Sequence, residues 1–143
     1  MKYIPSIILL LFGTVVSGED VKMQCEWDYS TYHFKYSDNL FKDKAYIRVN
    51  GEWIDYCEGM MSSVQQNYMH LNRKIVNYTV KDKGATCTFY GQDNKYNQDR
   101  EAYLMWTLDF EIMAAKTGYS TKNIEDGKWG KFTWFNEWQC TTF

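Results

Sequence analysis

The sequence predicts an α+β domain in which an antiparallel β-sheet packs against one main α-helix, stapled by two disulfides. Three observations lead to this prediction. Most segments are rich in β-branched and aromatic residues, only one segment repeats its apolar residues at helical spacing, and the chain contains four cysteines. Its 143 residues, 45% hydrophobic and 24% charged, suffice for one domain with a substantial core.

The first 18 residues have the form of a secretory signal peptide. Lys2 supplies a positive charge, a short apolar run follows, and Val16-Ser17-Gly18 ends in a small residue suited to signal peptidase. The apolar run is shorter than the roughly 20 residues of a membrane-spanning helix. We therefore expect residues 1–18 to be removed, leaving one secreted domain over 19–143 with no membrane anchor. Such a protein acts outside the cell or is delivered into a host cell.

All four cysteines follow the expected cleavage point, and an even number in an oxidising compartment predicts two disulfides. Four cysteines allow three connectivities. We favour Cys25–Cys140 together with Cys57–Cys87, because Cys25 and Cys140 lie near the two ends of the mature chain. The chain has no CxxC pair and only two histidines, so no metal site and no cofactor is expected.

Several segments are predicted to be strands, and the clearest signal among them is a hairpin. Asn50-Gly51 separates two β-rich runs, which is typical of a type I′ turn. A period-2 alternation of large apolar residues marks a later strand, and residues 119–130 are predicted to form a loop. The expected strands cover residues 21–27, 31–36, 45–49, 52–56, 75–80, 85–90, 104–112 and 131–140.

One helix is predicted over residues 59–72. Its apolar positions recur three or four residues apart, as on one face of an α-helix. These positions are Met60, Met61, Val64, Tyr68 and Leu71.

Aromatic residues crowd the last predicted strand and its approach. Trp134 and Trp138 are expected on one face of this strand and Phe135 on the other, so both faces carry rings. Most tryptophans are expected in the core, but a partly exposed ring here fits stacking on a sugar, a base or a protein. Asn77-Tyr78-Thr79 is a glycosylation sequon, which makes Asn77 a candidate if it faces solvent.

His33 and His70 are the only side chains with ordinary pKa values near neutrality. If the fold brought them together, they could act as acid and base in phosphodiester cleavage. The alternative is that His33 is a strand-face residue and His70 a helix-end residue. A formal charge of −2 argues against a strongly basic nucleic-acid binder.

Four short motifs stand out in the sequence: Tyr68-Met69-His70, Asp99-Arg100, Lys116-Thr117-Gly118 and Cys140-Thr141 near the end. Together they are similar to motifs of the small microbial guanyl-specific ribonucleases and of the ribonuclease-like effectors of powdery mildew fungi, and the first of them resembles the family's Tyr-Pro-His. The resemblance covers about half of the mature chain. It implies that His70, Arg100 and Lys116 contact RNA or phosphate.

The same resemblance implies that catalysis has been lost. Lys116 stands where the family has its catalytic acid histidine, and lysine is a poor acid at neutral pH. The catalytic glutamate has no clear counterpart in residues 86–90. The sequence thus predicts a monomeric, secreted, non-catalytic effector that binds a host protein or RNA. An active ribonuclease using His33 and His70, and an extracellular toxin or lectin-like module, are the alternatives.

Overall fold

The computed structural model describes residues 20–27, 29–63, 71–93 and 100–143 of the chain. The predicted signal peptide and His70 lie outside these residues. Within the described part, no helix is long and apolar enough to cross a membrane.

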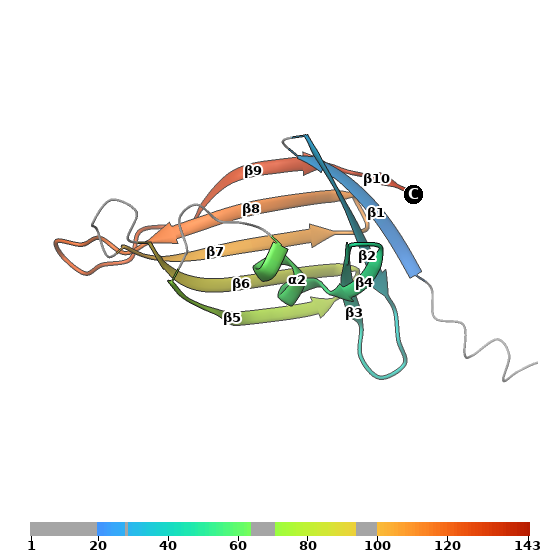
Figure 1. Ribbon diagram of the computed structural model, residues 1–143, viewed down its shortest axis with the longest axis horizontal. Coiled ribbons are helices and arrows are strands. Elements are labelled where there is room, and N and C mark those ends of the chain that lie inside the picture. The colour runs from blue at the N-terminus through green and yellow to red at the C-terminus, as the bar shows by residue number, and fades with distance from the viewer. Residues whose placement is uncertain (1–19, 28, 64–70, 94–99) are drawn as a thin grey trace, which may run out of the picture.

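Two antiparallel five-stranded sheets make up the domain (Figure 1). The small sheet has the order β10-β1-β2-β3-β4, and the large sheet has the order β5-β6-β7-β8-β9. The strands of the small sheet are β1 (Asp20–Trp27), β2 (Ser30–Ser37), β3 (Lys44–Val49), β4 (Glu52–Asp55) and β10 (Thr141–Thr142). Those of the large sheet are β5 (Leu71–Lys81), β6 (Gly84–Asp93), β7 (Arg100–Asp109), β8 (Ala114–Thr121) and β9 (Thr133–Gln139).

The predicted α+β class, with a sheet packed against one main helix, is wrong. The protein is mostly β, and its one described helix, α2 (Tyr56–Ser63), has only eight residues. The strands of the small sheet cross those of the large sheet steeply in Figure 1, so each sheet buries its inner face mainly against the other. A second sheet therefore fills the role that the prediction gave to a helix.

The helix is shorter than predicted and begins earlier. Asp55 caps it, since its Oδ2 accepts a hydrogen bond of 3.2 Å from the Glu58 backbone N–H. Tyr56 and Cys57, at its beginning, are completely buried. The predicted helix over 59–72 does not form as a whole, because β5 has already begun at Leu71. The helical spacing of apolar residues therefore misplaced both ends of the helix.

Aromatic residues fill much of the space between the sheets. Phe34 of β2 lies against Tyr56, with ring centroids 5.7 Å apart. Farther along, Trp106 of β7 stacks on Trp138 of β9 at 5.6 Å, and Trp27 at the end of β1 contacts both rings. The two sheets thus share one core.

Both favoured disulfides are confirmed. Cys57–Cys87 attaches α2 to β6, with Cα atoms 5.4 Å apart. Cys25–Cys140 joins β1 to the point where the chain leaves β9 of the large sheet for β10 of the small sheet, with Cα atoms 4.5 Å apart.

The predicted Asn50-Gly51 turn is also confirmed. Asn50 and Gly51 have φ angles of 51° and 82°, and Val49 pairs with Glu52 directly beyond them. Positive φ at both central positions is the geometry of a type I′ turn.

Strand β8 (Ala114–Thr121) was not predicted, and the strand predicted over 104–112 ends at Asp109. A turn with Met113 at φ 52° connects the two strands. The sequence of β8 is dominated by small residues, which have little intrinsic strand preference. It becomes a strand because β7 and β9 pair with it on both sides.

A β-bulge in β9 changes which way its tryptophans point. Thr117 pairs with Asn136 but Gly118 pairs with Trp134, so Phe135 is an extra residue in β9. Trp138 consequently faces the core, whereas Trp134 faces outward and is 50% exposed. The interpretation that both tryptophans share one face is wrong, because it assumed an unbroken alternation.

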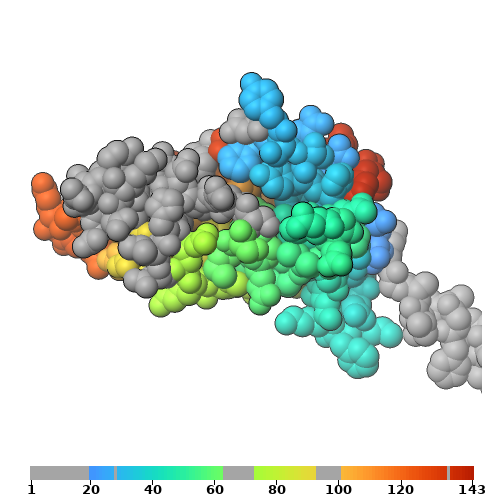
Figure 2. All heavy atoms as spheres, in the orientation of Figure 1, coloured from blue at the N-terminus to red at the C-terminus, as the bar shows by residue number. Residues whose placement is uncertain are grey.

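The loop between β2 and β3 projects from the body of the molecule, as the teal segment at the lower edge of Figure 2 shows. Leu40 and Phe41 in this loop are 73% and 97% exposed.

Candidate functional site

The residues predicted to contact phosphate do not gather at one described location. Arg100 is the first residue of β7, and Lys116 of β8 pairs with Thr107, seven residues farther along β7. At about 3.3 Å per residue, some 23 Å of strand lies between these positions. Because His70 lies outside the described residues, its contact with RNA stays a prediction.

Lys116 lies on the outer face of the large sheet. Its Nζ is 3.9 Å from Glu137 Oε1 and 5.9 Å from the centroid of the Trp134 ring. Lys116 therefore has a carboxylate partner, although an ion pair between two partly exposed side chains is weak.

His33 lies on the outer face of β2. Its Nε2 is at hydrogen-bond distance, 3.2 Å, from Gln24 Oε1, and its ring is 4.5 Å from that of Phe143. Neither neighbour titrates near neutral pH, so these contacts provide His33 with no acid–base partner.

A cluster of cations and aromatic rings surrounds His33 on the outer face of the small sheet, and we call it the small-sheet patch. Four of the five strands contribute to it or lead into it, and along β2 and β3 its side chains alternate with buried residues. The small-sheet patch consists of His33, Lys35, Tyr46, Arg48, Trp53 and Phe143.

Lys35 occupies the centre of the small-sheet patch. Its Nζ lies 4.7 Å from the centroid of the Tyr46 ring and 4.9 Å from that of Trp53. Arg48 approaches Trp53 as well, with its Cζ 5.8 Å from the ring centroid. Both cations are within the range of a cation–π interaction. Lys22 pairs with Lys35 across β1 and β2, which adds a further positive charge beside it.

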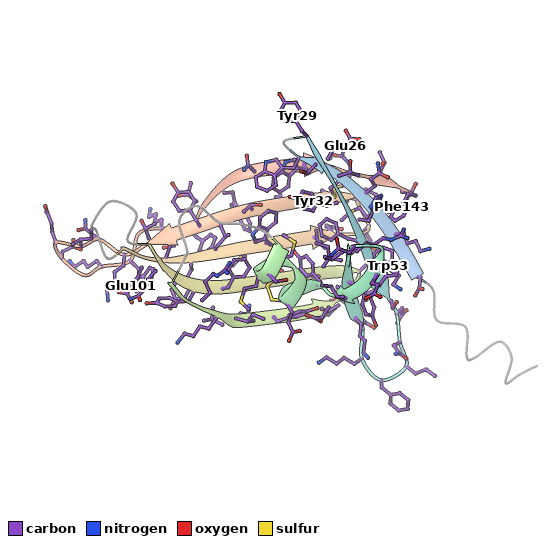
Figure 3. The ribbon with its side chains drawn as sticks, viewed as in Figure 1. Glu26, Tyr29, Tyr32, Trp53, Glu101 and Phe143 are labelled. Atoms are coloured by element: carbon purple, nitrogen blue, oxygen red, sulfur yellow. A yellow bond between two sulfur atoms is a disulfide. The ribbon has the colours of Figure 1, made fainter. Side chains whose placement is uncertain are left out.

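The carbon-rich half of the small-sheet patch is built by two rings from distant parts of the chain. Trp53 and Phe143 lie together on the small sheet in Figure 3, with ring centroids 6.4 Å apart and planes 29° apart. The Asn50-Gly51 turn sets the position of Trp53 opposite Arg48. Phe143 follows β10, whose place beside β1 is secured by the Cys25–Cys140 disulfide.

Two carboxylates of the same face are engaged elsewhere. Asp20 accepts a hydrogen bond from Ser37, and Asp55 accepts one from the Tyr78 hydroxyl as well as capping α2. Burial, reinforced by the Asp55 charge, raises the pKa of Tyr78, so this hydroxyl remains a donor at neutral pH.

Ion pairs between described residues occur only on the large sheet, at Lys116–Glu137 and Lys122–Glu101. Lys35 and Arg48 of the small-sheet patch have no carboxylate partner within 4.0 Å in the part of the chain that the structure describes. These cations are therefore available to an anion such as a phosphate, and the rings beside them are available for stacking with a planar group such as a base.

Sequence reasoning missed the small-sheet patch, although a signal for it was present. Once the Asn50-Gly51 hairpin is accepted, Tyr46 and Arg48 share a face with Trp53 by strand alternation. The contribution of Phe143 could not be found this way, because it depends on β10 pairing with β1.

Asn77 of the sequon is exposed on β5 and faces outward from the large sheet. It thus meets the condition set for a glycosylation candidate. No group of three His, Cys, Asp or Glu side chains suited to a metal ion occurs among the described residues.

Comparison with known proteins adds no assignment: the chain matches no protein-family model, no curated protein and no solved structure.

Proposed function

We propose that the protein is a secreted, non-catalytic binding protein and that its small-sheet patch binds single-stranded RNA. In this proposal it acts as an effector on RNA of a host cell. The arrangement of Lys35 and Arg48 at the Trp53 ring is the observation that supports it best.

Single-stranded nucleic acids are bound by cations that follow the phosphates and by rings on which bases stack. The small-sheet patch has both features within a few ångströms of each other, and its cations lack described ion-pair partners. A protein partner would not require this alternation of cations and rings, so RNA is favoured over a host protein.

Two disulfides are consistent with an extracellular protein, because such bonds persist in oxidising compartments. The absence of catalysis is proposed from the surroundings of His33, whose contacts are an amide and a phenyl ring.

Binding is tested by fluorescence anisotropy with a labelled single-stranded RNA over a range of salt concentrations. Replacing Lys35 and Arg48 together by Ala should reduce the slope of log K against log salt by about 1.4, since each phosphate contact contributes about 0.7. Trp53→Ala should weaken binding by about fivefold to 160-fold while leaving the slope unchanged, because a stacked base contributes about 1–3 kcal/mol.

Lys81→Ala is the matched control, since this exposed lysine ends β5 on the large sheet. It should alter neither the affinity nor the slope. A wild-type protein that does not bind RNA, or equal losses for Lys81→Ala and for the double variant, would refute the proposal.

A separate assay tests the absence of catalysis. Pure wild-type protein should leave RNA intact under conditions in which binding is measured. Hydrolysis that disappears in His33→Ala or His70→Ala would instead establish an active ribonuclease.

A further inference from the structure

The outer face of the large sheet exposes aromatic side chains that no described residue covers. Trp129, Phe132 and Trp134 are 39%, 37% and 50% exposed. Their neighbours Tyr90 and Tyr103 are half-buried, and the rings form a chain of contacts, with Tyr103 4.5 Å from Trp129 and 5.7 Å from Tyr90. Contiguous exposed apolar surface on a soluble protein generally has an occupant.

The register of the strands connects this surface to the sequon. Asn77 pairs with Thr88, Thr88 with Met105, Met105 with Gly118, and Gly118 with Trp134. Paired residues lie on the same face of a sheet, so these five form one row across the outer face. With strands about 4.8 Å apart, the row is about 19 Å long.

The row leads from the sequon to the aromatic rings. Asn77 is exposed, Met105 is half-buried and Thr88 is only 7% exposed. The rings of Phe132 and Trp134 lie over Gly118, since a Cβ there would be 2.8 Å from Phe132 Cε1 and 2.9 Å from Trp134 Cε3. Tyr90 and Tyr103 border the row on one side. The row therefore connects the exposed Asn77 amide with partly exposed aromatic rings.

This face carries fewer unpaired cations than the small-sheet patch. Lys116 and Lys122 are paired with Glu137 and Glu101, whereas Lys74 lies 5.4 Å from the centroid of the Tyr90 ring. The balance of charge therefore favours a neutral occupant. A carbohydrate chain has no formal charge to match, and the apolar C–H faces of its sugar rings pack well on aromatic side chains.

We propose that an N-linked glycan attached to Asn77 lies along this row and covers the aromatic side chains of the large sheet. Attachment forms an N-glycosidic bond from the Asn77 amide nitrogen to the first sugar of a lipid-linked donor, and the lipid pyrophosphate leaves. The covalent link makes the subsequent ring contacts intramolecular, so individually weak contacts suffice. The inference shares with the proposed function only the route through the secretory pathway.

The test uses the full chain secreted from a glycosylating eukaryotic host. Intact-mass measurement should show one glycan, absent from Asn77→Gln. Removal of the glycan from the folded protein by peptide N-glycosidase should increase acrylamide quenching of tryptophan fluorescence. That increase should be lost when Trp129 and Trp134 are both replaced by Phe.

A relocated glycan is the matched control. In the Asn77→Gln background, Lys42→Asn with Lys44→Thr creates a sequon in the projecting β2–β3 loop. A glycan there should not protect the tryptophans. An unoccupied Asn77, unchanged quenching after glycan removal, or equal protection by the relocated glycan would overturn the proposal. None of these readouts depends on RNA binding, and the enzymatic arm needs no variant that must fold.

Discussion

The outer faces of the two sheets expose similar aromatic side chains but differ in how their charges are arranged. On the small sheet, Lys35 and Arg48 lie at the Trp53 ring without a described carboxylate partner. On the large sheet, Lys116 lies near Trp134 but is also paired with Glu137. Ring content alone therefore does not determine what a sheet face binds; the state of the neighbouring charges distinguishes an anionic partner from a neutral one.

The largest effect on stability is expected from removing the disulfide that links the two sheets. Replacing Cys25 and Cys140 together by Ser removes the disulfide at the passage between the sheets and should lower the free energy of unfolding by about 2–5 kcal/mol. Urea unfolding under non-reducing conditions measures it. The Cys57→Ser/Cys87→Ser variant is the comparison: its bridge closes 30 rather than 115 residues, so chain entropy predicts a loss about 1 kcal/mol smaller. A larger loss for this second variant would contradict the prediction.

The next effect acts on the small sheet only. Gly51→Val places a β-branched residue at a φ of 82°, which should cost about 1–2 kcal/mol and shift Trp53 relative to Arg48. RNA affinity should fall, whereas tryptophan quenching on the large sheet should not change. Gly51→Asn, which tolerates positive φ, should retain stability and binding. If both variants behave alike, the turn does not determine the geometry of the small-sheet patch.

A complementary change acts on the large sheet only. A Cβ at Gly118 would lie 2.8 Å from Phe132 Cε1 and 2.9 Å from Trp134 Cε3, so Gly118→Ala must displace both rings. Displacement from preferred rotamers should cost about 1 kcal/mol and change tryptophan fluorescence, with RNA binding unaffected. Gly84→Ala is the control, because its nearest contact would be an ordinary 3.4 Å. Identical spectra for wild type and Gly118→Ala would mean that the rings do not rest on this glycine.

The smallest effect concerns pH. The hydrogen bond from its hydroxyl to Glu101 raises the pKa of Tyr90 to about 12, because it favours the neutral phenol in the folded protein. Stability from this bond is complete below the ordinary tyrosine pKa of about 10 and is lost as the pH rises toward about 12. Hydrogen bonds from Lys122 and, to a smaller extent, from Tyr90 lower the pKa of Glu101. The stability that ionised Glu101 contributes is therefore present above the ordinary carboxyl pKa and is lost as the pH falls.

The tyrosinate absorbance of wild type minus that of Tyr90→Phe should therefore show one tyrosine titrating near pH 12. Because solvent screens both groups at the surface, the change in stability should be small. A difference spectrum that titrates near pH 10 would show that the hydrogen bond does not persist in solution.

Local chemistry made some of the fold predictable. The Asn50-Gly51 turn follows from two adjacent residues that tolerate positive φ, and the disulfide pairing follows from the positions of Cys25 and Cys140 near the ends of the mature chain. The prediction of a helix over 59–72 was wrong and β8 was not predicted, because in these segments local sequence did not decide the structure. Residue spacing near Met60 resembled a helix, and half of β8 consists of Ala, Gly and Ser, so tertiary pairing decided both cases.

The candidate site was less predictable than the fold. Lys116 was predicted to contact phosphate because of the ribonuclease resemblance. The structure places it beside Glu137 and far from Arg100, the first residue of β7. The small-sheet patch requires Phe143 to meet His33, which lies 110 positions earlier in the chain. The outward orientation of Trp134 requires the bulge at Phe135, and a single extra residue in a strand leaves no periodic signal.

The same bulge has a consequence for association. A regular edge strand offers a row of unpaired backbone groups to which another strand can add. Here β9 is interrupted at Phe135, and β5, at the opposite edge, has two register shifts, between Leu71 and Lys74 and between Ile75 and Asn77. The edges of the small sheet, β4 and β10, are only four and two residues long. Strand addition at β4, β5 and β9 is thereby discouraged, and partners are directed to the sheet faces and the loops.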